Sequence, residues 1–271
     1  MTVTRQHVSW AVALCSFLVV GTAAATTPTE DGPRVDFETV DYTDGKDTFQ
    51  GFVATPVGAT AARLPGVLVV HNWMGVSDET RAQAARIAAL GYVVFGADVY
   101  GKGVRPNGME QAGQLAGKFK GDRALFRARL LLGLGELAKH TRVDASRMFA
   151  VGYCFGGTGV IELARAGAAI KGVVSFHGGL DSPAPADGAR ITARVLALHG
   201  ADDPFVPAAE VAAFEKEMAT HGVDWQLVKF GGAVHSFSEK AAGNDKSRGA
   251  AYDARADARS FQLLGLFLAM P

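Results

Sequence analysis

The chain has 271 residues, enough for one large α/β domain with a substantial core. Hydrophobic residues make up 48% of it and charged residues 20%, a globular and not a disordered composition. The 27 lysines and arginines balance the 27 aspartates and glutamates, so the charge gives no reason to expect nucleic acid or an anionic membrane as a partner.

The first 25 residues have the layout of a secretory signal peptide. Arg5 precedes an apolar stretch, Val8 to Val20, and the small residues Ala23 to Ala25 follow it. The stretch is shorter than the roughly 20 residues of a membrane-spanning helix, which favours cleavage over an uncleaved anchor. We therefore expect an exported protein, periplasmic or secreted, with no membrane attachment after cleavage. The predicted divisions are a signal peptide over 1–25, a linker over 26–34 and one domain over 35–271.

Cleavage after Ala25 would remove Cys15 and leave Cys154 as the only cysteine. Exported proteins usually pair their cysteines in disulfides, and a single thiol has no partner within the chain. A lone thiol in an oxidising compartment therefore indicates that Cys154 serves chemistry.

The elements of the domain alternate between strands and helices. Two stretches with alternating apolar and polar residues, Val35–Tyr42 and Gln50–Thr55, predict an opening antiparallel hairpin. The runs that follow are short and almost wholly apolar, as in parallel strands buried on both faces. Those strands are Gly66–Val70, Tyr92–Phe95, Met148–Val151, Gly172–Phe176, Arg194–Leu198 and Trp225–Phe230. The helical stretches between and after them are Asp78–Leu90, Arg123–His140, Thr158–Ala166, Ala208–His221 and Ala250–Leu268.

This order predicts an α/β fold with a mostly parallel sheet flanked by helices. The segment Lys102–Lys120 is rich in glycine and polar residues, and we expect it to form a lid or the rim of a pocket. Within it, Met109, Leu115 and Phe119 either face a substrate or pack as helical core residues.

Active sites of open α/β sheets lie at the carboxyl ends of the strands, so the polar residues there carry the functional prediction. Gly152–Gly157 places Cys154 between an apolar run and a helical stretch, the pattern of a nucleophile elbow with sulfur in place of serine oxygen. The following helix would present its positive end to a thiolate. On this hexapeptide alone, a buried structural cysteine in a glycine-rich turn is the alternative.

An acid and a histidine follow in the chain order of α/β-hydrolases. Asp202 and Asp203 come after Arg194–Leu198, and His235 comes after the last strand. Local sequence leaves both aspartates open, and either one also suits a plain turn before Pro204. His235 could equally be a loop histidine.

The residue types fit acyl transfer. Cys154 would attack as thiolate, His235 would move the proton, and an aspartate would hold the histidine tautomer. The backbone N–H groups of Phe155 and Trp73 are the expected oxyanion donors. No metal-ligand spacing, P-loop or GxGxxG motif is present, so we expect neither metal nor cofactor.

Other polar residues at the strand ends have alternative roles. His71, His177 and His199 read as structural or pocket-lining groups. A serine-type esterase using Ser175 or Ser236 is disfavoured because neither lies in a Gly-x-Ser-x-Gly frame.

The chain resembles the dienelactone hydrolase family of α/β-hydrolases from about Val35 onward. The matching segments are Ala97–Tyr100, Gly152–Gly157, His199–Pro207 and Gly232–Phe237. The resemblance favours Asp203 over Asp202. It implies an eight-stranded α/β-hydrolase fold, a Cys-His-Asp triad and hydrolysis of a small-molecule ester or lactone through a thioester, without cofactor. A monomer or small homo-oligomer is expected.

Three positions depart from the family members that act on dienelactone. Asn72 replaces a glutamate that helps to activate the cysteine, and Lys102 and Glu239 replace two arginines that bind the substrate carboxylate. We therefore expect a different and less acidic substrate, because glutamate repels a carboxylate and lysine lacks the bidentate fork of arginine. The residues expected to contact the substrate are Asn72, Lys102, His177, Ser236 and Glu239. The same departures motivate the alternative of a hydrolase-fold binding protein with a degenerate site.

Overall fold

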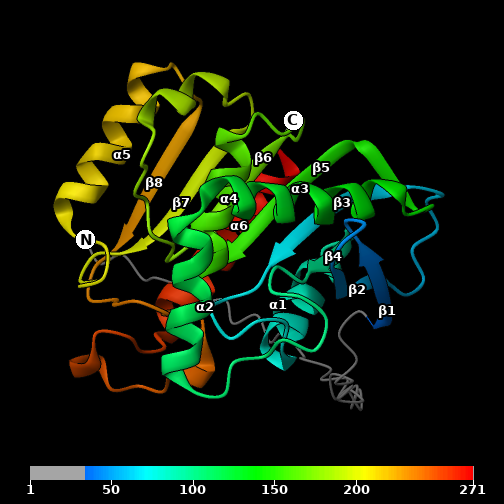
Figure 1. The fold of residues 1–271 in the computed structure, drawn as a ribbon, viewed down its shortest axis with the longest axis horizontal. Helices are drawn as coiled ribbons and strands as arrows, with labels where there is room; N and C mark the ends of the chain where they lie inside the picture. The colour runs from blue at the N-terminus through cyan, green and yellow to red at the C-terminus, as the bar shows by residue number, and fades with distance from the viewer. Residues whose placement is uncertain (1–33, 271) are drawn as a thin grey trace, which may run out of the picture. The chain divides into compact units, whose positions relative to one another are not determined.

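The computed structural model describes residues 34–270. Within them, eight strands form one sheet in the order β1-β2-β4-β3-β5-β6-β7-β8 (Figure 1). β1 is antiparallel to β2, and β2 is antiparallel to β4, whereas the other neighbours are parallel. The mostly parallel eight-stranded sheet predicted from the sequence is confirmed. The strands are β1 Val35–Thr43, β2 Thr48–Pro56, β3 Leu64–Val70, β4 Val93–Ala97, β5 Val143–Tyr153, β6 Gly172–Phe176, β7 Arg194–Gly200 and β8 Trp225–Phe230.

Helices cover both faces of the sheet (Figure 1). Successive residues of a strand point to opposite faces, so Leu68 and Val70 of β3 pack with α3, α4 and α5, whereas Val67 and Val69 pack with α1 and α6. This two-sided burial explains why the strand sequences are almost wholly apolar. The helices are α1 Asp78–Ala88, α2 Met109–Gly121, α3 Arg123–Lys139, α4 Phe155–Arg165, α5 Ala208–Thr220 and α6 Ala254–Ala269. Three short 3₁₀ helices span Pro185–Arg190, Lys240–Ala242 and Lys246–Arg248.

Three predicted elements differ in extent. The expected lid contains helix α2, which buries Phe119 in the core, half-buries Leu115 against it and leaves Met109 at a pocket. Helix α4 begins at Phe155, three residues before the predicted start, because Cys154 is already its N-cap. Helix α6 begins four residues late, after the Asp253 side chain caps its first amides.

The segment around Ala250, predicted to begin this helix, forms backbone hydrogen bonds with another loop instead. The His235 N–H donates to the Gly249 carbonyl at 3.1 Å, and the Ala251 N–H donates to the His235 carbonyl at 3.0 Å. These two bonds hold the segment before α6 against the loop that carries His235.

None of the helices between residues 34 and 270 has the length and apolar character needed to cross a bilayer. The predicted signal peptide lies outside the described residues.

Candidate active site

A strained turn presents Cys154 between β5 and α4. Cys154 has φ 53° and ψ −113°, which is a costly conformation for a residue with a side chain. The glycines around it are required by close backbone contacts. A Cβ on Gly152 would lie 2.0 Å from the Gly156 carbonyl oxygen, and one on Gly156 would lie 2.2 Å from the Val70 carbonyl oxygen. The glycine pattern thus permits the sharp turn predicted from the sequence.

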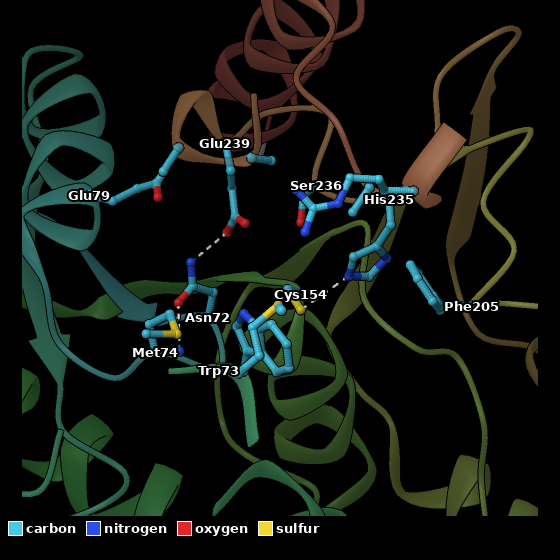
Figure 2. A pocket seen from close by; sticks show the side chains of 14 residues that line it. Asn72, Trp73, Met74, Glu79, Cys154, Phe205, His235, Ser236 and Glu239 are labelled. Carbon is cyan, nitrogen blue, oxygen red and sulfur yellow. Dashed lines mark hydrogen bonds between the residues drawn. The ribbon is translucent and has the colours of Figure 1, made fainter. Parts of the chain in front are cut away.

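Three side chains from separate strand ends meet at this turn. His235 Nε2 lies 3.1 Å from Cys154 Sγ (Figure 2). His235 Nδ1 lies 2.8 Å from Asp203 Oδ2. Asp203 is buried, and its other oxygen accepts a hydrogen bond from the Phe205 N–H at 2.8 Å. Asp202 is exposed instead. A thiol, an imidazole and a carboxylate are therefore joined in one chain of contacts.

The electrostatics favour a charged imidazole at His235. Burial alone would lower the pKa of His235, but the negative charge of Cys154 and the hydrogen bond to Asp203 outweigh it and raise that pKa to about 10. At neutral pH the ring is therefore an imidazolium that lies between the Cys154 sulfur and the Asp203 carboxyl group.

Two residues next to Cys154, in the chain or in the cavity lining, have backbone N–H groups that could serve as oxyanion donors: Phe155 follows it in the sequence, and Trp73 lines the same cavity. Phe155 is the first residue of α4, so its N–H has no acceptor within the helix. The Trp73 N–H, in the loop after β3, donates no hydrogen bond within the described part of the chain. The Phe155 ring is fixed in the core by stacking on Phe126, with centroids 4.5 Å apart. Both donors thus remain available on well-packed residues.

A cavity of about 480 Å³ opens above Cys154. Its apolar wall consists largely of Trp73, Met74, Met109 and Phe205, together with three alanines. Besides Cys154 and His235, the polar residues that line it are Asn72, Glu79, Ser236, Glu239 and Arg248. Glu79 and Glu239 lie toward Asn72, whereas His235 and Phe205 lie on the other side of Cys154 (Figure 2). The cavity suits a small molecule with the group to be attacked placed at the thiol.

The carboxyl groups in the cavity have perturbed acidities. Glu239 is buried and accepts a hydrogen bond from the Asn72 amide at 2.9 Å. Burial raises the pKa of Glu239, and the Asn72 hydrogen bond offsets part of that rise. Burial and the charge of Glu239 raise the pKa of Glu79 to about 7. The charge of the pocket therefore changes near neutral pH.

The structure brings only some of the expected substrate contacts into the cavity. Asn72, Ser236 and Glu239 line it, and Ser236 has a positive φ of 56°. Lys102 does not, because its ammonium pairs with Asp41 at the β1 strand. His177 is fully buried behind His235, with the ring centroids 5.3 Å apart and its Nε2 2.8 Å from Ser238 Oγ. Of the five predicted contacts, Lys102 and His177 therefore lie outside the cavity lining.

Sequence reasoning missed Glu79, Phe205 and Arg248. Glu79 lies in the first turn of α1, where an acidic residue complements the helix dipole and gives no hint of a pocket. Phe205 was within the segment that resembles the family, but without an assigned role. Arg248 lies in an exposed 3₁₀ turn with no recognisable motif. No group of three or more His, Cys, Asp or Glu side chains between residues 34 and 270 is arranged to hold a metal ion.

Comparison with known proteins places this geometry in a family. Residues 49–269 match the dienelactone hydrolase family. The chain belongs to the dienelactone hydrolase family. It is therefore a member of a family of hydrolases, as the resemblance of its strand-end motifs implied. Comparison with curated protein sequences gives no match.

Solved structures agree with this assignment. The chain is 38% identical to a structure described as m3DLH, with a TM-score of 0.83, over 86% of this chain and 97% of that one. It is 36% identical to a dienelactone hydrolase-like promiscuous phosphotriesterase from metagenomic libraries, with a TM-score of 0.81, over 87% and 98% of the two chains. A dienelactone hydrolase from Anabaena variabilis shares the fold at 20% identity and a TM-score of 0.65, over 88% and 97%.

Proposed function

We propose that this member of the dienelactone hydrolase family cleaves a carboxylic ester or lactone with Cys154, His235 and Asp203 as a catalytic triad. The observation that carries the proposal is the continuous contact chain of 3.1 Å from Cys154 Sγ to His235 and 2.8 Å from His235 to Asp203. A thiol held against an imidazolium is an activated nucleophile.

The reaction follows from this arrangement. The Cys154 thiolate attacks the acyl carbon, and the carbonyl oxygen becomes an oxyanion bound by the Trp73 and Phe155 N–H groups. His235 then protonates the leaving alkoxide, which departs as an alcohol and leaves a thioester on Cys154. Water, deprotonated by His235, attacks the thioester and releases the carboxylic acid, while the thiolate and the imidazolium are restored. Asp203 keeps the His235 ring oriented throughout.

The charges in the cavity support a substrate without a carboxylate next to the scissile bond. Glu239 lines the cavity beside Asn72, and Glu79 adds a second carboxyl group. Asn72 donates to Glu239 and cannot take a proton from the thiol, so thiol activation falls on His235 and the α4 terminus. We therefore propose a neutral or positively charged ester or lactone. Arg248 is exposed at the cavity and marks where a distal anionic group would be tolerated.

Phosphotriesters form a second substrate class for testing. The observation behind them is the 36% identity, over nearly the whole of both chains, with the promiscuous phosphotriesterase. Attack of Cys154 at phosphorus would use the same nucleophile and the same oxyanion donors.

Steady-state turnover of short acyl esters tests the proposal. Turnover is expected to vanish in Cys154→Ala and His235→Ala and to persist in Lys102→Ala, whose side chain lies outside the cavity. Unchanged turnover in a folded Cys154→Ala variant contradicts the proposal.

Export is proposed from the sequence of residues 1–25, and the N-terminal sequence of the mature protein recovered from the periplasm or medium tests it.

A further inference from the structure

His71, at the end of β3, holds two backbone groups that belong to different loops. Its Nδ1 lies 2.6 Å from the Asn72 carbonyl oxygen, and its Nε2 accepts a hydrogen bond from the Val99 N–H at 3.2 Å. A carbonyl oxygen can only accept and an amide N–H can only donate. The ring is therefore neutral, with its proton on Nδ1. Burial lowers the pKa of His71 to about 4, which keeps the ring in this state at neutral pH.

The carbonyl bound by His71 belongs to the same peptide unit as the Trp73 N–H. In a trans peptide the C=O and N–H point to opposite sides, and the described chain contains no cis peptide bond. When the Asn72 carbonyl points at the His71 ring, the Trp73 N–H must point away from it. The Gly75 N–H also donates to this carbonyl, at 3.2 Å, so a flipped peptide would lose both bonds and replace the N–H donor with a carbonyl oxygen.

The surroundings of His71 hold the ring in place. The ring stacks on Phe155 with centroids 5.8 Å apart and meets the Tyr100 ring edge-on at 4.8 Å. The Tyr100 hydroxyl donates to the Trp73 carbonyl at 2.9 Å, so the next peptide is fixed as well. His71 therefore contacts the loop of one candidate oxyanion donor and the side chain of the other, while remaining outside the cavity lining.

We propose that His71 is a positioning residue, which holds the Asn72–Trp73 peptide so that the Trp73 N–H is preformed as an oxyanion donor. The inference rests on the proposed acyl transfer at Cys154, since only an oxyanion needs that donor. It assigns a function to a histidine that lies outside the cavity lining.

Two substitutions separate the two hydrogen bonds of the ring. In His71→Asn the side-chain amide nitrogen can take the place of Nδ1 and donate to the Asn72 carbonyl. In His71→Gln the side-chain amide oxygen can take the place of Nε2 and accept from the Val99 N–H, while the Nδ1 donor is lost. His71→Phe keeps a packed ring without either bond and serves as a second loss variant if the glutamine variant does not fold. His140→Gln, at the far end of α3, is the matched control.

Two reactions of the same thiol are compared in each variant. Acylation by an activated acetate ester passes through an oxyanion, whereas alkylation by iodoacetamide displaces iodide at a saturated carbon and forms none. We expect kcat for the ester to fall about 100-fold in His71→Gln and in His71→Phe, but only about tenfold in His71→Asn. KM should change by less than about threefold in all three variants. The alkylation rate should match the wild type in all three variants.

Equal losses of kcat in the asparagine and glutamine variants would overturn the proposal, as would alkylation that slows in parallel with acylation. Mass spectrometry of acylated Cys154 distinguishes a failure of the proposed function from a failure of the positioning role of His71. If wild-type protein forms no acyl adduct, the proposed function fails. If wild type is acylated and folded His71→Gln is acylated at the same rate, the positioning role alone fails.

Discussion

The substitution Gly156→Ala tests how the nucleophile turn depends on close backbone packing. A Cβ at this position would lie 2.2 Å from the Val70 carbonyl oxygen and 2.6 Å from the His71 carbonyl oxygen. Both obstructing atoms belong to the backbone of the β3 end and cannot rotate away. Helix α4 must therefore shift off β3 and carry the Phe155 N–H and Cys154 with it.

The magnitude follows from two opposing effects. Overpacking of this kind costs about 1–3 kcal/mol, and contact with two backbone atoms places this site at the upper end. Alanine regains about 1 kcal/mol over glycine in a helix. We expect a net loss of about 2 kcal/mol in the free energy of unfolding, which lowers Tm by about 4–8 °C in a protein of this size. A displacement near 1 Å at the turn should reduce kcat about 100-fold.

Chemical denaturation and ester turnover measure these effects. The control is Gly117→Ala in α2, where an added Cβ meets nothing within 4 Å. That change should stabilise the protein by up to about 1 kcal/mol and leave kcat unaltered. An unfolding free energy of Gly156→Ala within about 0.5 kcal/mol of wild type, with unchanged kcat, would refute the reasoning.

Three further predictions concern the charges of the site. In Asp203→Asn the acceptor for the Phe205 N–H is kept but the carboxylate is lost, so kcat for an ester should fall by roughly 10⁴, as it does in serine triads; a loss below about tenfold contradicts the orienting role. In wild type, activity should decline as pH rises through about 10, where the His235 imidazolium loses its proton, and a pH–rate profile of Asp203→Asn should show this limb at lower pH. As pH rises through about 7, Glu79 gains its charge, so KM should fall for a cationic ester and rise for an anionic one. Each change should be roughly fivefold for an interaction of about 1 kcal/mol. Glu79→Gln should remove the pH dependence of both KM values, and a dependence that persists in this variant excludes Glu79 as its source.

The parallel strands and their places along the chain were predictable because both faces of the sheet are covered. Burial on two sides leaves short, almost wholly apolar runs, and these are visible in a single sequence. The polar residue that follows each run then falls at the edge where the site lies. Cys154, His235 and the pair Asp202 and Asp203 were identified for this reason, and the family resemblance selected Asp203. The contact of the three side chains in space follows from the parallel strand arrangement.

The bounds of helix α2 were not predicted, and its helical character was left as one of two alternatives, because its periodic signal is narrow. Only Ala112, Ala116 and Phe119 are buried, and two of these are alanines. Glycines at three positions and the lack of a side-chain cap at Gly108 weaken the local signal further. Packing of Phe119 against Phe126 and Phe155 stabilises this helix, and such tertiary contacts are not encoded in local sequence.

Ion pairs between residues far apart in the sequence could not be predicted either. Arg165 is fully buried in α4 and pairs with Glu217 of α5, 52 positions away, as well as with Glu162. Lys102 was aligned with a pocket position but pairs with Asp41 of β1. In each case the deciding partner is known only once the fold brings it close.

The most direct test of the account is the covalent state of Cys154 during turnover. Wild-type protein mixed with an activated ester and quenched at early times should carry the acyl group on the peptide that contains Cys154, as read by mass spectrometry. His235→Ala should accumulate far less adduct at the same times. Turnover of the ester without any adduct on Cys154, or with the acyl group on another residue, would contradict the proposed nucleophile.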